Sequence, residues 1–149
     1  MADTARSLSN ITERYGDRYM HRDPVAASEE VYIGALYSLD AGGDLADATD
    51  VAARELMGVA AERVTGGSTD GSAGASTGVF ARVYRKCRAI FNSTGTLAVG
   101  DLCYVVDNQT VTDAGTAAND IPVGRIYATT GFTARHGMSN AVEVDVGQF

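Results

Sequence analysis

Hydrophobic and polar residues alternate along much of the chain after residue 30. In residues 31–39, VYIGALYSL, every second position is apolar or aromatic, which is the period of a strand with one buried face. Residues 55–64, ELMGVAAERV, predict a second strand. The overlapping stretch 48–60 is rich in alanine and contains Asp50, a good helix cap, so a helix is the alternative there. Gly58 weakens that alternative, because glycine destabilises a helix interior.

Residues 78–92, GVFARVYRKCRAIFN, predict the longest strand of the chain. Its apolar face carries Val83, Cys87, Ala89 and Phe91, and its polar face carries Arg82, Tyr84, Lys86 and Arg88. Arg85 falls on the apolar face, so we expect its charge to be paired there or at an interface.

Later segments complete the pattern of short strands separated by turns. Residues 102–106 and 110–112 flank a DNQ turn and predict a hairpin, and 121–129 predict a strand with Gly124 at a bulge. The clearest half-buried strand lies in 141–149, AVEVDVGQF. Its valines at 142, 144 and 146 are expected inside, and Glu143 and Asp145 outside. This pattern predicts a mainly β fold, either a small β-barrel or a β-sandwich.

The first 30 residues differ from the rest, because they are rich in charge and poor in aliphatic residues. Asn10 and Glu13 have the spacing of a capping box, so a short helix beginning at Ile11 is expected. One face would carry Ile11, Tyr15 and Tyr19, and the other Arg14, Arg18 and Arg22. The segment is either a disordered tail or an arm that orders on a neighbour through its tyrosines and arginines.

The chain is therefore predicted to contain an extended, partly helical N-terminal arm, residues 1–30, and a β-rich domain, residues 31–149. Within that domain, residues 66–77 consist of glycine and small or polar residues, and we expect a flexible loop.

Charge and composition narrow the partners. The chain of 149 residues has a formal net charge of −7, which argues against nucleic acid because phosphate binding needs a basic face. No apolar run approaches the roughly 20 residues of a membrane span, and the N-terminus lacks the apolar core of a secretion signal. We therefore expect a protein that is made in the cytosol and binds neither nucleic acid nor membrane.

Residues that carry chemistry are few. The two histidines, His21 and His136, have no cysteine or second histidine at metal-ligand spacing. Cys87 and Cys103 lie in apolar segments and are expected to be buried thiols, with a cross-strand disulfide as the alternative. Neither a phosphate-binding loop nor a GxSxG nucleophile motif occurs. We expect no catalytic, cofactor-binding or metal site, and no enzymatic activity.

One acidic segment invites a calcium interpretation. It carries Asp40, Asp44, Asp47 and Asp50, but their spacing differs from that of an EF-hand loop. A solvated acidic loop is the expectation. Alternatively, its surplus charge meets the cations between Arg82 and Arg88 on a neighbouring copy.

Several segments, taken in order, resemble the small capsid cement, or decoration, proteins of tailed bacteriophages. They are VYIGALYSLDAGGDLADATD, ELMGVAAERV, GTLAVGDLCYVVDNQTVT, IPVGRIY and AVEVDVGQF, and the similarity extends over about four-fifths of the chain. The resemblance implies a compact β-barrel-like or sandwich domain on the outer surface of the virion head, made in the cytoplasm of the host bacterium. Such a domain bridges major capsid subunits, forms trimers or dimers, and has no cofactor and no catalytic residues.

The N-terminal 30 residues are longer and richer in arginine than a cement domain needs, which suggests an additional capsid-gripping arm. The predicted partner contacts are Arg14, Tyr15, Arg18, Tyr19, Arg22, Arg82, Arg85, Lys86 and Arg88. Two alternatives stay open. One is a head-fibre base or tail-tube protein, and the other is a small carbohydrate-binding module, which would rely on tyrosine because the chain has no tryptophan.

Overall fold

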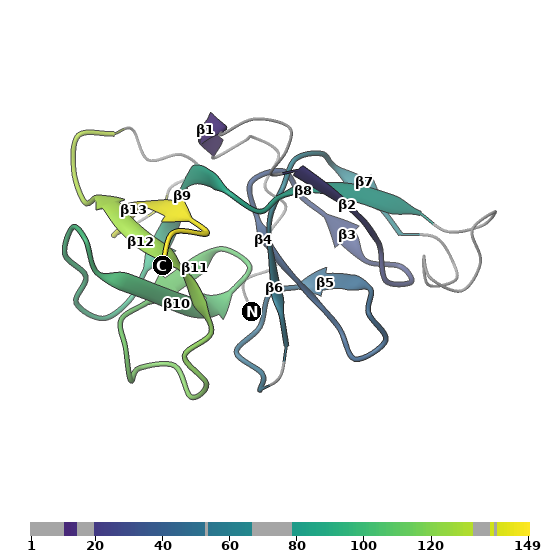
Figure 1. The fold of residues 1–149 in the computed structure, drawn as a ribbon. Coiled ribbons are helices and arrows are strands. Elements are labelled where there is room, and N and C mark those ends of the chain that lie inside the picture. The colour runs from purple at the N-terminus through teal and green to yellow at the C-terminus, as the bar shows by residue number, and fades with distance from the viewer. Residues whose placement is uncertain (1–10, 15–19, 53, 67–78, 133–137, 139) are drawn as a thin grey trace.

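The computed structural model describes residues 11–14, 20–52, 54–66, 79–132, 138 and 140–149 (Figure 1). These residues form strands and turns, with no helix among them. The strands are β1 (Ile11–Arg14), β2 (Met20–Pro24), β3 (Glu30–Val31), β4 (Leu36–Leu39), β5 (Leu45–Asp47), β6 (Leu56–Ala60), β7 (Val64–Thr65), β8 (Phe80–Tyr84), β9 (Cys87–Ser93), β10 (Leu102–Asp107), β11 (Thr110–Thr112), β12 (Pro122–Ala128) and β13 (Val142–Val146).

Five strands of the second half close a small barrel (Figure 1). The order is β9, β11, β10, β12, β13 and back to β9, with β9–β11 parallel and the other pairs antiparallel. The predicted hairpin is confirmed as β10 and β11, and the β10–β12 register shifts beside Gly124. A side chain at Gly124 would meet the backbone oxygen of Asp145 at 2.0 Å, so β12 and β13 approach too closely for any other residue. The mainly β fold and the barrel are confirmed.

A second sheet, in the order β2, β8, β6, β4, β5, lies beside the barrel (Figure 1). One of its faces packs on the barrel, because Leu36, Val59 and Tyr84 belong to the same buried cluster as the barrel interior. The other face contributes Tyr37 and Val83 to a separate buried cluster, which the short β3–β7 ribbon also joins. Both faces of this sheet are therefore buried.

The N-terminal segment forms strands where the structure describes it, so the helix predicted to begin at Ile11 is wrong at residues 11–14. β1 pairs antiparallel with β9, with Ile11 opposite Ala89, and β2 pairs antiparallel with β8, with Met20 opposite Tyr84. Because β8 and β9 are consecutive, the segment follows both of them and connects the second sheet to the barrel. Pairing with these strands outweighs the local helix signal, since tertiary context overrides propensity.

Three predicted strands are interrupted. The segment 78–92 divides after Tyr84 into β8 and β9, which belong to different sheets. The segment 31–39 breaks at a turn that includes Gly34, whose φ of 85° is a left-handed value suited to glycine. The segment 55–64 becomes β6 and β7, and its helical alternative is wrong.

Polar contacts lock the barrel to the second sheet at the tip of the β10–β11 hairpin. The backbone N–H of Leu36 donates to the carbonyl of Asn108 at 2.8 Å, and the Asn108 amide donates to the Asp47 carboxylate at 3.0 Å. Nearby, the Asp50 carboxylate accepts hydrogen bonds from the backbone N–H groups of residues 118 and 119, at 2.7 and 3.0 Å. These bonds cross between the two halves and fix their relative orientation.

Candidate partner-binding surface

The arginines between residues 82 and 88 are paired within the chain. Arg82 lies 3.2 Å from Glu62, Arg85 lies 3.7 Å from Glu55, and Arg88 lies 2.9 Å from Asp145. The expected pairing of Arg85 is confirmed. Because each arginine faces a carboxylate of its own chain, these residues do not form the basic stripe that the sequence suggested.

Arg88 is the most enclosed of these cations. Its side chain is only 19% exposed, and its guanidinium lies 3.4 Å from the centre of the Tyr127 ring while Nε donates to Asp145. Arg88, Tyr127 and Asp145 come from three neighbouring barrel strands, β9, β12 and β13. These contacts tie the three strands together, so Arg88 has a structural role that needs no external partner.

Arg22 differs from the cations after residue 80. It is exposed on β2, directly opposite Arg82 on β8, and its guanidinium lies 5.1 Å from the centre of the Phe80 ring. Two arginines facing each other across adjacent strands repel, and Glu62 neutralises only one of them. This place therefore keeps a local positive charge on an acidic chain.

Other predicted contacts are only partly visible. Arg14 lies in β1 opposite Cys87, but its side chain is outside the described residues, as are Tyr15, Arg18 and Tyr19. Of the two histidines, His21 is exposed on β2, and His136 is also outside the described part of the chain.

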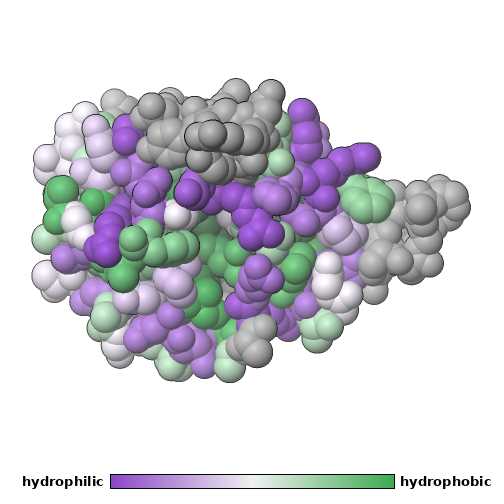
Figure 2. Space-filling model, viewed as in Figure 1, coloured by the Kyte–Doolittle hydropathy of each residue, from purple (hydrophilic) through white to green (hydrophobic). Residues whose placement is uncertain are grey.

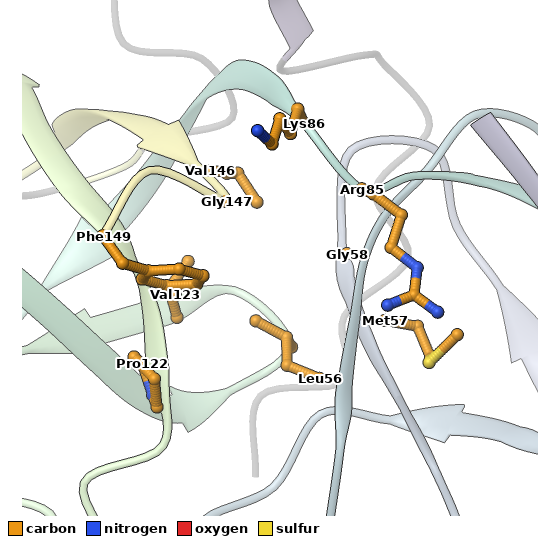
Figure 3. A pocket seen from close by; sticks show the side chains of 10 residues that line it. All are labelled: Leu56, Met57, Gly58, Arg85, Lys86, Pro122, Val123, Val146, Gly147 and Phe149. Carbon is orange, nitrogen blue, oxygen red and sulfur yellow. The ribbon is translucent and has the colours of Figure 1, made fainter. Parts of the chain in front are cut away.

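A cleft separates the barrel from the second sheet, at the middle of the face where Figure 2 shows hydrophobic side chains gathering. Its volume is about 230 Å³. The lining residues are Leu56, Met57, Gly58, Arg85, Lys86, Pro122, Val123, Val146, Gly147 and Phe149 (Figure 3). A Cβ at Gly58 would lie 2.1 Å from the Tyr84 oxygen, and one at Gly147 would lie 2.5 Å from the Arg85 oxygen. The two glycines therefore let β6 and the end of β13 approach the β8–β9 connection.

The acidic loop is not uniformly solvated, which corrects the sequence-based expectation. Asp44 is 1% exposed, and Asp40 accepts hydrogen bonds from the backbone N–H groups of Gly42 and Asp44 at 2.9 and 3.0 Å. Asp47 and Asp50 bind the barrel, as described above. These carboxylates organise the chain around them instead of waiting for calcium or a second copy.

Aspartates order the barrel loops in the same way. Asp113 accepts a hydrogen bond from the backbone N–H of Thr96 at 2.9 Å and one from the Thr116 hydroxyl. The bond from Thr116, followed by that from Thr96, lowers the pKa of the Asp113 carboxyl. Asp113 therefore stays ionised and connects two loops far apart in the sequence.

Several side chains with chemical potential are buried. Cys87 and Cys103 are free thiols with no exposed surface, so the prediction of two buried thiols is confirmed. Burial raises the pKa of the Cys103 thiol to about 12, which keeps it protonated and unreactive. Glu143 was expected outside but is only 8% exposed. Asp23 on β2 has one carboxylate oxygen buried without a hydrogen-bond partner, and burial raises its pKa.

Comparison with known proteins identifies no relative: no family model, no curated protein and no solved structure matches this chain. Among the described residues, no group of three or more histidine, cysteine, aspartate or glutamate side chains is placed to hold a metal ion. In the same residues, no helix is long and apolar enough to cross a membrane.

Two contributors to this surface were not anticipated from the sequence. Glu62, in the turn before β7, pairs with Arg82 from a distant strand, and Phe80 supports Arg22 from the neighbouring one. The available signal was period two itself, since Phe80 and Arg82 must share a face of β8. The sequence offered no signal for the pairing of β2 with β8.

Proposed function

We propose that this chain is a structural virion protein that binds the outer surface of a bacteriophage capsid, bridges major capsid subunits and stabilises the head. The order of the five quoted segments supports the proposal, and so does the small closed barrel. We further propose that it acts as a trimer or a dimer, and that its partners are the major capsid protein and other copies of itself.

The observation that carries the proposal is the rigidity built into the loops. Six aspartates in or beside loops accept hydrogen bonds from backbone N–H groups: Asp40, Asp50, Asp101, Asp107, Asp113 and Asp120. Loops fixed in this way lose little conformational entropy when they contact a partner. A body with fixed loops and locked halves suits a protein whose task is to hold neighbouring subunits at a set distance.

The test is co-sedimentation of the purified chain with expanded, undecorated heads, assembled from the major capsid protein encoded nearest to this chain's own gene. We expect saturable binding at a fixed number of copies per capsid subunit, and decorated heads that resist a higher temperature. Absence of binding, together with rings or tubes formed by the chain alone, would instead support a tail-tube protein. Retention on a glycan array without head binding would support the carbohydrate-binding alternative.

A further inference from the structure

We propose that Arg22 and Arg82 together form a docking point for a carboxylate on the capsid subunit. This inference rests on the proposed function and narrows the predicted contacts to one pair. Arg22 on β2 and Arg82 on β8 are direct cross-strand neighbours, and both are exposed. The strand pairing therefore places two cationic side chains next to each other on one face of the second sheet.

The geometry prepares this pair for an anion. The guanidinium of Arg22 lies over the Phe80 ring, which restricts its orientation before any partner arrives. Arg82 uses its Nε and one terminal nitrogen to bind Glu62, at 3.3 and 3.2 Å, and this holds its guanidinium in place. Within the described part of the chain, Glu62 is the one carboxylate in an ion pair with either cation. A second carboxylate would complete the charge balance and relieve the repulsion.

The chain's own acidic residues are poor candidates for that second carboxylate. The partly or fully exposed aspartates named above already accept backbone hydrogen bonds. Glu55 and Glu62 already face arginines. A second copy of the chain would have to break one of these contacts. A carboxylate supplied by a different protein would not, and we therefore assign it to the capsid subunit.

Arg63 provides a matched control. It is exposed and lies 5.0 Å from the centre of the Tyr32 ring, so it has the same stacking as Arg22, but it also lies 3.4 Å from Glu30. Removing the charge of Arg63 tests stacking and overall charge without removing an unneutralised cation.

The first experiment measures head binding by Arg22→Gln, which keeps part of the stem over Phe80, and by Arg63→Gln. We expect Arg22→Gln to weaken binding at least tenfold and to flatten its salt dependence, while Arg63→Gln binds within twofold of the unchanged chain. Equal affinity for Arg22→Gln and the unchanged chain would overturn the inference. If Arg22→Gln unfolds at a lower temperature, Arg22→Lys replaces it. Lysine keeps the charge but lacks the planar fork, and we expect intermediate binding.

A second experiment needs no capsid. The arginine Nε–H resonances are followed by NMR while a hexaglutamate peptide is added, with a hexaserine peptide as reference. We expect hexaglutamate to shift the Arg22 and Arg82 signals and to leave Arg63 unchanged. Equal shifts at Arg63 would overturn the docking point even if heads bind. Selective shifts at Arg22 and Arg82, with no head binding, would refute the proposed function and leave the carboxylate site standing.

Discussion

The replacement Gly147→Ala tests whether the junction between the two halves requires direct backbone contact. Gly147 has a φ of 81°, and its N–H donates to the carbonyl of Val123 at 2.9 Å. An added Cβ would lie 2.5 Å from the backbone oxygen of Arg85. The change therefore imposes a left-handed backbone on alanine and also forces two strand ends apart.

Gly115 separates these two effects. Its φ is 82°, almost the same, but no atom lies within 4 Å of the position that a Cβ would occupy there. For Gly115→Ala we expect a loss of about 1–2 kcal/mol from the backbone alone. For Gly147→Ala, overpacking adds about 1–3 kcal/mol to the same loss. For a chain of this length the total lowers Tm by on the order of 10 °C.

The assay is urea unfolding of both variants and the unchanged chain, with Tm measured by calorimetry. The difference between the two variants isolates the contact with Arg85, because the backbone cost is common to both. If Gly147→Ala is no less stable than Gly115→Ala, the close approach at the junction does not constrain the fold, and the reasoning is refuted.

Three further predictions concern single side chains. Because burial raises the Asp23 pKa above 3.8, the stability it contributes is present below pH 3.8 and is lost as the pH rises through its folded-state pKa. Asp23→Asn should remove this dependence from the Tm profile between pH 3 and 7 (roughly the range that spans both pKa values), and an unchanged profile would contradict the assignment. Asp50→Ala should lower the free energy of unfolding by about 1–3 kcal/mol, since two backbone N–H groups lose their acceptor; urea unfolding measures this, and a loss below a few tenths would count against the clamp. Cys87 and Cys103 should resist a thiol reagent in the native chain and react in urea, whereas rapid native labelling would show that the barrel opens.

Local alternation was enough to predict the strands that need no special partner. Residues 142–146 became β13 with their valines buried, and the DNQ turn became the β10–β11 hairpin. Alternation fixes the direction of a side chain but not what covers that face, which explains why Glu143 proved buried.

The breaks and the pairings depended on distant parts of the chain. The division after Tyr84 arises because β8 and β9 join different sheets, and β2 reaches β8 across more than 50 residues. The same limit applied to the surface. The need to pair Arg85 was visible from its place on the apolar face, but its partner Glu55 was not.

The path of the N-terminal segment also sets an order of events during synthesis. β1 and β2 are made early, yet their partners β9 and β8 emerge from the ribosome only after some 60 more residues. Until then, β1 and β2 have no strand to pair with, and the second sheet lacks its edge. The barrel waits longer still, because β13 closes it against β9 and β12. Folding of this chain is therefore expected to be largely post-translational and slow for its size, since distant pairings must form before either half is complete.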